Sequence, residues 1–326
     1  MTRVLITGVT GQDGSLLATA LRGEGHEIHG LCQTGLAIPA PIRELLDGVT
    51  LHDGDLADAA GIGELVDAVA PDEVYHLAGQ SSVALSWEDP IGTLVSTGLG
   101  AGIVFEAAYR LQERRGTPVR VLQASSAEIF GRAEQTPQDE DTPVRPVSPY
   151  GVAKATAHQL ASVYRQRGLF VACTILYNHE STLRPPSFVT RKITMGAARI
   201  SVEGGELTLG NLDAGRDWGW APDYVRAMVL ALRHTEPDDF VVATGEVHTV
   251  EDFVRVAFAR AGIANWQAHV RTDPAFVRPV DAAVQVGDAS KARRVLGWAP
   301  SVGFDDLVGR MVEHDLALAH LAGDAG

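Results

Sequence analysis

The chain has 326 residues, 45% of them hydrophobic and 21% charged, which is the balance of a folded globular protein rather than a disordered one. Its 27 Lys and Arg face 41 Asp and Glu, and this net charge of −14 argues against nucleic-acid and anionic-membrane partners. Two cysteines outside any CxxC or Cys/His cluster predict neither a disulfide framework nor a metal site. Because the N-terminus runs straight into a strand-like segment and no apolar run approaches about 18 residues, we expect a cytoplasmic protein without a membrane span.

The first half of the chain alternates short apolar runs with amphipathic stretches, which predicts βαβ units and a parallel, doubly wound sheet. We expect buried strands at Arg3–Thr7, Glu27–Leu31, Glu73–Leu77, Val119–Ala124 and Phe170–Leu176. Helical spacing is found in Ser15–Arg22, Ala57–Ala70, Thr97–Arg115 and from about Tyr150 to Gln166. After Asn178 the alternation becomes irregular, with strand-like pieces near Leu207–Leu209 and Phe240–Thr244 and helices near Val250–Ala261 and Phe304–Ala319. This divides the chain into a core at 1–177 and a lobe at 178–326, some of whose segments return to the sheet.

The first strand leads into a glycine-rich loop, G-x-x-G-x-x-G, at Gly8, Gly11 and Gly14, and a helix follows. Glycines allow a tight turn and the close approach of a pyrophosphate, which the amides of a helix N-terminus can hold. At the first strand–helix junction of a βαβ series, the loop predicts a dinucleotide site, with a plain glycine-rich turn as the alternative. The predicted fold is therefore α/β: a Rossmann-type doubly wound parallel sheet with a smaller C-terminal substrate-binding lobe.

The end of the second strand should carry the residue that reads the adenosine ribose, an acid for NAD or a cation for the NADP phosphate. The segment Leu31–Thr34 has neither. Gln33 and Thr34 could serve either form, and Arg43 from the following helix is a conceivable substitute cation. We therefore expect weak discrimination, with NADP slightly favoured because no carboxylate excludes its phosphate. Asp55 could accept a hydrogen bond from the adenine amino group, or else cap the next helix.

Tyr150 and Lys154 are four residues apart at the start of a predicted helix, so both side chains lie on one face. A nearby ammonium favours phenolate and lowers the pKa of a tyrosine, which makes a usable base for an alcohol proton. A Y-x-x-x-K pattern alone is common and mostly a solvated helix face. Upstream, however, a predicted strand ends near Ser126, whose hydroxyl could bond the same substrate oxygen.

Two further stretches narrow the comparison: Asn178–Ser181, which reads NHES, and Phe188–Lys192, which ends in VTRK. With the glycine loop and the Tyr/Lys pair, they resemble the extended short-chain dehydrogenase/reductase family and, within it, the GDP-mannose 4,6-dehydratases. Related reductases and epimerases usually lack these two stretches. The likeness runs from residue 2 to about 318 and also includes Gly54–Leu56, Gln80–Ser81, Ala124–Gly131, Ser148–Tyr150, Leu209–Asn211, Arg216–Gly219, Phe240–Gly245, Arg278–Pro279 and Leu296–Trp298.

The resemblance implies a nucleotide-sugar 4,6-dehydratase, an NAD(P)-dependent hydro-lyase that turns GDP-mannose into GDP-4-keto-6-deoxymannose by C4 oxidation, C5/C6 dehydration and hydride return to C6. Tyr150 would be the base, Lys154 its electrostatic partner, Ser126 a hydrogen-bond donor, and Glu128 the acid/base for the C5 proton and the loss of water. The tightly bound, recycled NADP or NAD would contact Gly8, Thr10, Gly11, Gln12, Asp13, Gly14, Gln33, Asp55, Leu56, Leu77, Ala78, Gln80, Tyr150, Lys154, His179 and Arg184. The nucleotide sugar would contact Ser81, Ser126, Asn178, Val189, Lys192, Leu209, Asn211, Arg216 and Arg278.

The chain also departs from the family pattern. Ser126 stands where the family usually has Thr, Ala127 where it has Ser, and Gly92 where a Tyr near the cofactor is expected. The basic, Ser-rich stretch that in the family binds the NADP phosphate and helps to form tetramers is replaced by Cys32–Ala37. We therefore expect a homodimer, with a tetramer as the alternative.

The same residues are compatible with other functions. A 4-epimerase or 4-keto reductase on the same fold would use Tyr150 and Lys154 without requiring Glu128, which could instead be a loop carboxylate; some sugar-nucleotide decarboxylases also have a Glu there. A non-catalytic redox sensor would bind a dinucleotide and a protein partner, but mere binding needs no catalytic set. Arg216, beside Asp217, could bind a diphosphate or form a structural salt bridge.

Overall fold

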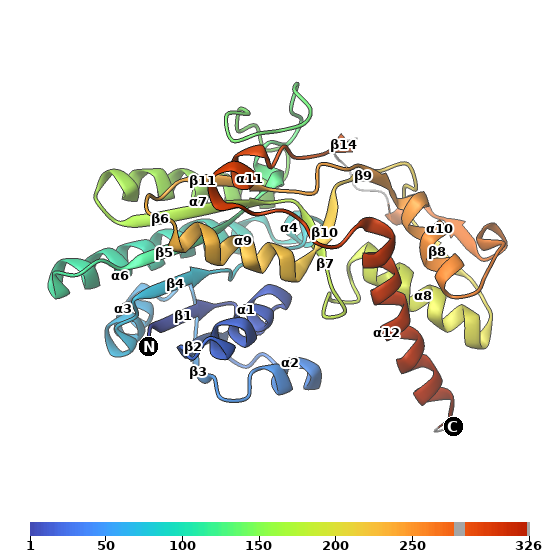
Figure 1. Cartoon of the computed structure of the whole chain (residues 1–326), viewed down its shortest axis with the longest axis horizontal. Coiled ribbons are helices and arrows are strands. Elements are labelled where there is room, and N and C mark those ends of the chain that lie inside the picture. The colour runs from blue at the N-terminus through green and yellow to red at the C-terminus, as the bar shows by residue number, and fades with distance from the viewer. Residues whose placement is uncertain (277–283, 325–326) are drawn as a thin grey trace.

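The computed structural model describes residues 1–276 and 284–324, so Arg278, which the sequence assigns to the substrate, lies outside the described residues. A seven-stranded parallel sheet in the order β11-β6-β5-β4-β1-β2-β3 spans the larger part of the molecule (Figure 1). Its strands are β1 (Arg3–Thr7), β2 (Glu27–Gln33), β3 (Thr50–Gly54), β4 (Glu73–His76), β5 (Arg120–Ser126), β6 (Phe170–Leu176) and β11 (Asp239–Val242). The strand order reverses between β1 and β4, which is where a doubly wound sheet opens a crevice for its ligand. The predicted Rossmann-type sheet is confirmed.

Helices cover both faces of the sheet. One face packs against α1 (Gln12–Gly23), α2 (Ala40–Leu45), α9 (Ala221–Arg233) and α11 (Ser290–Leu296). The other face packs against α3 (Ala59–Val69), α6 (Gly100–Arg115) and α7 (Pro149–Gln166), with α4 (Val83–Glu88), α5 (Pro90–Thr93) and the π-helix η1 (Leu94–Leu99) leading into α6. Two separate apolar clusters therefore hold the strands between two helical layers, and their polar ends remain free for a site.

A third apolar cluster forms from later residues, on the side of the molecule where α8, α10 and α12 lie (Figure 1). Its helices are α8 (Val189–Glu203), α10 (Val250–Arg260) and α12 (Phe304–Asp324). Short strands surround them: β7 (Asn178–Glu180) with β10 (Trp218–Trp220), β8 (Leu207–Leu209) with β13 (Val270–Thr272), and β9 (Gly215–Arg216) between β12 (His248–Thr249) and β14 (Val284–Gln285). The 3-10 turns are η2 (Ala127–Ile129), η3 (Trp266–Ala268) and η4 (Pro274–Phe276).

Several elements were not predicted from the sequence, and three of them illustrate why. β3 is an edge strand with mostly exposed side chains, so it lacks the apolar run by which the other strands are recognised. α9 carries Pro222 in its first turn, which looks like a helix breaker but is well tolerated there. α8 lies between Pro186 and Gly204, and these flanking turn residues suggested irregular structure.

The helical segment Pro90–Arg115 corrects our expectation that no apolar run is long enough to span a membrane. Its 26 residues are long and apolar enough by composition alone, and half of the most apolar window is buried inside the protein. Ala101, Val104 and Phe105 of this segment pack into the cluster beneath the sheet, as expected of a core helix.

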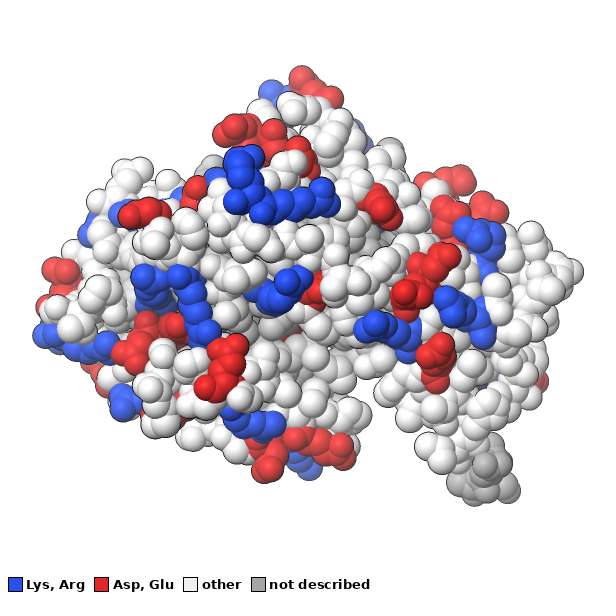
Figure 2. Space-filling view, viewed as in Figure 1, with Lys and Arg blue, Asp and Glu red and all other residues white. Residues whose placement is uncertain are grey.

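On the face shown in Figure 2, acidic and basic side chains are interspersed, and no extended basic surface is seen.

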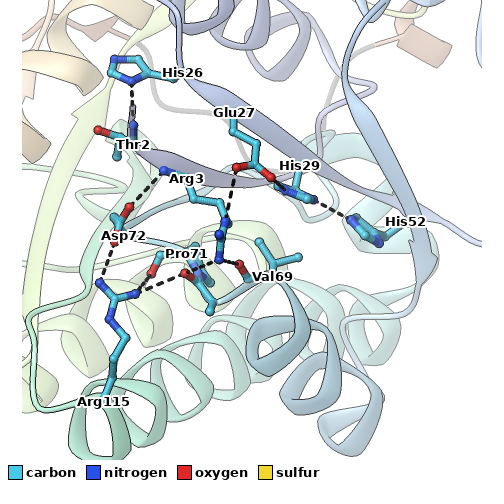
Figure 3. Close-up of polar contacts among 11 residues, drawn as sticks. Thr2, Arg3, His26, Glu27, His29, His52, Val69, Pro71, Asp72 and Arg115 are labelled. Atoms are coloured by element: carbon cyan, nitrogen blue, oxygen red, sulfur yellow. Dashed lines mark hydrogen bonds and ion pairs between the residues drawn. The ribbon is translucent and has the colours of Figure 1, made fainter.

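A polar network fastens the amino ends of the strands (Figure 3). The Arg3 guanidinium donates to the Val69 carbonyl at 2.7 Å and reaches Glu27 at 3.4 Å, while the Arg3 amide donates to Asp72 at 3.0 Å. Arg115 pairs with the same Asp72 carboxylate at 2.6 Å. These contacts lie at the end of the sheet opposite the glycine loop, so they hold the strands in place without occupying the ligand crevice.

Candidate active site

A cavity of about 1230 Å³ opens at the carboxyl ends of the strands and extends to the C-terminal helices. Every site residue predicted from the sequence that lies within the described ranges lines it. These are Gly8, Thr10, Gly11, Gln12, Asp13, Gly14, Gln33, Asp55, Leu56, Leu77, Ala78, Gln80, Ser81, Ser126, Glu128, Tyr150, Lys154, Asn178, His179, Arg184, Val189, Lys192, Leu209, Asn211 and Arg216. Residues far apart in the chain thus face one space.

The glycine loop is shaped to admit a dinucleotide. Gly8 has a φ of +72°, and a Cβ on it would meet Ala78 backbone atoms at 2.8 Å. A Cβ on Gly14 would lie 2.3 Å from the Gly8 carbonyl oxygen, so helix α1 can approach the loop only with glycine there. Gly11 caps α1 without a side chain, which leaves the first-turn amides facing the cavity, where an anion can bind. These residues fit the pyrophosphate of a dinucleotide.

Side chains of β7 bind the first turn of α1. His179 Nε2 lies 2.8 Å from the Asp13 carboxylate and its Nδ1 lies 2.7 Å from the Tyr177 carbonyl, while the ring stacks on Tyr224 at 4.6 Å. Burial alone would lower the pKa of His179, but the Asp13 carboxylate outweighs burial and raises it. The Gln12 amide donates to the His179 carbonyl at 3.2 Å and accepts from the Ser181 hydroxyl at 2.8 Å. We call these contacts the β7–loop clasp.

Tyr150 and Lys154 lie on the cavity side of α7, whose N-cap Ser148 accepts from the Gly151 amide at 3.0 Å. Lys154 Nζ donates to the Ala124 carbonyl at 2.9 Å and lies 5.9 Å from the centre of the Tyr150 ring. Burial raises the pKa of Tyr150 to about 12, although a hydrogen bond with Ser126 acts the other way. Burial also lowers the pKa of Lys154 to about 8.

The expectation that Lys154 lowers the pKa of Tyr150 is therefore wrong for the protein on its own. Both side chains are more than nine-tenths buried, and loss of water around the phenol raises its pKa more than the Ser126 hydrogen bond and the charge of Arg184 lower it. A pKa of about 12 keeps the phenol neutral near pH 7.

Ser126 is the last residue of β5, and Glu128 lies two residues later in the turn η2. The Ser126 hydroxyl accepts from the Glu128 backbone amide at 3.3 Å, and this bond caps the short turn η2 that follows the strand. Glu128 is half-buried, and its charge contributes to the raised pKa of Tyr150, so the carboxylate and the phenol share one part of the cavity. The Tyr150 phenol, the Ser126 hydroxyl and the Glu128 carboxylate therefore lie together in one part of the cavity.

Cations line the cavity on the side of the C-terminal helices. Arg184 Nε lies 3.1 Å from the fully buried Glu180 carboxylate, and its guanidinium stacks 3.7 Å above the Phe188 ring. Glu180 also accepts from the Thr190 hydroxyl at 2.7 Å. Burial raises the pKa of Glu180, and Arg184 opposes that effect. Glu180 was not predicted as a site residue, and it acts by orienting Arg184.

Two more cations, Lys192 and Arg216, line that side of the cavity. Lys192, in the first turn of α8, has its Nζ 4.1 Å from the centre of the Phe276 ring. Arg216 is buried on β9 and donates to the Gly215 carbonyl at 2.8 Å. Asp217, the proposed structural partner of Arg216, accepts from Thr244 and from the Gly245 amide at 2.7 to 2.9 Å, and so anchors the loop after β11. Phe276 and Tyr224 were missed because single aromatic residues carry no motif.

Asp55 lies at the opposite side of the cavity. Its carboxylate accepts from the Ala57 amide at 2.9 Å, whereas the N-cap of α3 is Asp58, which accepts from Gly61. The alternative reading of Asp55 as a helix cap is therefore wrong, and the side chain stays at the cavity wall.

Outside the cavity, one cluster in the described ranges gathers metal-ligand atoms: His158, Cys173 and Asp239, within 4.8 Å of one another. Arg165 occupies this cluster, because its guanidinium pairs with Asp239 and donates to the Cys173 sulfur at 3.4 Å. Burial raises the pKa of Cys173, so the sulfur remains a thiol. We interpret the cluster as a buried ion pair.

The sheet, the glycine cradle and the Ser126–Tyr150–Lys154 group define a dinucleotide-dependent enzyme of the extended short-chain dehydrogenase/reductase type. The solved structure of a Thermus thermophilus UDP-glucose 4-epimerase in complex with NAD matches with a TM-score of 0.83 and 30% identity, over 96% of this chain and 98% of that one. A model of the GDP-mannose 4,6 dehydratase family matches residues 5–311.

Curated relatives agree with that model. GDP-mannose 4,6 dehydratase 2 of Arabidopsis thaliana is 46% identical, over 97% of this chain and 87% of its own length. GDP-mannose 4,6 dehydratase of Homo sapiens is 38% identical, over 96% and 91%. The chain belongs to the GDP-mannose 4,6-dehydratase family, and the resemblance inferred from its motifs is confirmed.

Proposed function

We propose that the protein converts GDP-mannose to GDP-4-keto-6-deoxymannose with loss of one water. The observation that carries this is the placement of Glu128 beside Ser126, Tyr150 and Lys154 in one cavity. Oxidation and reduction at C4 need only the last three residues. Removal of a carbon-bound proton and expulsion of a hydroxyl need a further acid/base group, and Glu128 is the carboxyl in position.

Tyr150 takes the proton of the 4-hydroxyl in this proposal. Ser126 donates a hydrogen bond to the same oxygen and keeps it in reach, and the ammonium of Lys154 stabilises the phenolate. A bound dinucleotide would be held by the glycine loop from Gly8 to Gly14 and would supply the hydride acceptor for C4 and the hydride donor for C6. Because the overall conversion is redox-neutral, it would need no second redox substrate.

Glu128 acts once C4 is a ketone, which makes the neighbouring C5–H bond acidic. Its carboxylate removes the C5 proton and delivers a proton to the departing C6 hydroxyl, which leaves as water. Glu128 is half-buried in the part of the cavity that also holds Tyr150, so its carboxylate is placed to reach the same sugar.

The substrate diphosphate pairs in this proposal with Lys192 and Arg216, and Asn178 bonds the sugar nucleotide beside them. Charge-assisted bonds to phosphate are about twice as strong as neutral ones, which explains how so acidic a chain can hold a dianion. We further propose a guanosine preference over uridine and thymidine, because the NHES and VTRK stretches that distinguish this family lie on β7 and α8 at the cavity.

Incubation of the purified protein with a panel of GDP, UDP and dTDP sugars tests the proposal. Dehydration lowers the product mass by one water and creates a 4-ketone that borohydride reduces. An epimer of unchanged mass from any of these sugars would favour the 4-epimerase reading. Dinucleotide binding without turnover of any sugar would favour the sensor. Preferred turnover of a UDP or dTDP sugar would overturn only the guanosine assignment.

We also propose that two copies pair through η1 and α7, which pack on each other and present Leu99, Val152 and Val163 to solvent. Such an exposed apolar face on adjacent helices is typical of a subunit interface. Sedimentation of the protein and of Leu99→Glu tests this, with a dimer expected for the first and a monomer for the second.

Two free, buried thiols and a nucleotide substrate support a cytoplasmic location.

A further inference from the structure

The end of the cavity nearest the adenosine ribose is neutral to acidic. Its wall at the carboxyl ends of β2 and β3 consists of Gln33, Leu36, Gly54 and Asp55. Gln33 ends β2 and pairs in register with Gly54 on β3, so its side chain stands where a Rossmann sheet reads the 2′ position of the ribose. Gln33 and Leu36 are both exposed, and neither is held by the core.

Carboxylates stand behind this wall. Asp53 is the register partner of Cys32 on the adjacent strand, and it adds to the effect of burial in raising the pKa of the Cys32 thiol. Asp55 faces the cavity itself. A 2′-phosphate would bring close to two negative charges into this region, whereas a ribose hydroxyl would bring none.

Arg43 is the cation that could have compensated that phosphate. Its guanidinium donates instead to the Ile38 carbonyl at 3.2 Å, within its own exposed segment, and Arg43 is not part of the cavity wall. Within residues 1–276 and 284–324, the Lys and Arg side chains that line the cavity are Lys154, Arg184, Lys192 and Arg216. All four come from α7 or from residues after 178, so they face the nicotinamide and the sugar nucleotide.

We propose that this enzyme takes NAD in preference to NADP and that Gln33 is the residue that sets the choice. Its carboxamide bonds a ribose hydroxyl in the manner of the acid usually found there, while Asp53 and Asp55 disfavour a phosphate. The inference rests on the proposed function only for the presence of a dinucleotide and not for the identity of the sugar. It reverses the slight lean toward NADP that the sequence suggested, because the structure turns Arg43 away.

Titration of cofactor-stripped protein with NADH and NADPH tests the proposal, with nicotinamide fluorescence as a readout that needs no sugar turnover. We expect NADH to bind about 100-fold more tightly, a difference of about 2.7 kcal/mol. A preference for NADH of less than tenfold, equal binding or a preference for NADPH would overturn the proposal. Binding of neither nucleotide would overturn both this inference and the proposed function.

Two variants test which residue sets the preference between NAD and NADP. Gln33→Arg should strengthen NADPH binding about tenfold or more, because it adds a cation at an exposed position beside the ribose, and should weaken NADH binding, because it removes the carboxamide that bonds the ribose hydroxyl. Arg43→Gln is the matched control and should change neither affinity. A selective loss of NADPH binding in Arg43→Gln would show that Arg43 serves the phosphate and would contradict the proposal.

The sugar-nucleotide panel, run with protein reloaded with each dinucleotide, separates the two claims. Dehydration supported by NADPH-selective protein would leave the proposed function intact and remove only the cofactor inference. Selective NADH binding without dehydration of any sugar would support the cofactor inference and overturn the proposed function.

Discussion

The two ends of the cavity differ in how they can hold phosphate. At the β1–α1 end, glycines and helix amides form the cradle, and the Asp13 carboxylate in the first turn of α1 is paired with His179. At the other end, Lys192 and Arg216 reach in from α8 and β9. Backbone amides bind any pyrophosphate of the right shape, whereas placed cations can be gained or lost by single substitutions. We therefore expect backbone geometry to determine binding of the dinucleotide pyrophosphate, and side chains to determine binding of the sugar-nucleotide diphosphate.

The largest effect is expected where the two ends meet. Tyr150→Phe removes the base and should lower turnover by at least about 10²–10⁴-fold while dinucleotide binding stays near normal. Product mass and cofactor titration measure the two quantities. Tyr164→Phe on the same helix, where the hydroxyl bonds Glu106, is the control and should keep its activity. Wild-type turnover in Tyr150→Phe would remove Tyr150 from the chemistry.

Glu128→Gln should separate the steps of the reaction. Oxidation at C4 continues, because Tyr150 and Lys154 are untouched, but the C5 proton has no acceptor and dehydration stalls. Reduced nicotinamide then accumulates and is visible by its near-ultraviolet absorbance. Glu134→Gln, an exposed carboxylate paired with Arg145, serves as the control. Normal dehydration in Glu128→Gln would show that the carboxylate is structural and would strengthen the epimerase reading.

Lys192→Met tests whether the cations belong to the sugar-nucleotide end. Loss of one charge-assisted bond costs about 1.5–3 kcal/mol, so KM for GDP-mannose should rise about 10- to 100-fold. Dinucleotide affinity should not change. Lys291→Met, which removes a surface pair with Asp238, is the matched control. An equal loss of dinucleotide affinity in Lys192→Met would erase the distinction between the two ends.

The smallest effect concerns pH. Burial lowers the pKa of Lys154 to about 8, so its ammonium supports the Tyr150 phenolate below that pH and loses its charge above it. Turnover should therefore fall severalfold as pH rises through about 8. In Lys154→Arg the guanidinium remains charged, so that alkaline decline should disappear even if the overall rate is lower. A decline at the same pH in both proteins would assign it to another group.

Features that lie within one short segment of the sequence could be predicted. Features that depend on residues brought together by folding could not. The strands of the sheet, the glycine loop and the Tyr150–Lys154 spacing are legible because each lies within one short segment. Edge strand β3 has no buried face to leave a pattern, and Glu180 acts only through Arg184, which folding brings beside it. The raised pKa of Tyr150 likewise depends on burial, which residue spacing does not encode.

The β7–loop clasp has a consequence for the order in which the protein is completed. It joins Gln12 and Asp13 to residues 166 to 169 positions later in the chain. At about 5–20 residues per second, the ribosome needs roughly 10–30 s to make that interval. The dinucleotide loop is among the first segments to emerge, yet its side chains gain their partners only after β7 has been synthesised. We therefore expect cofactor capture to follow the synthesis of β7, which ends at Glu180.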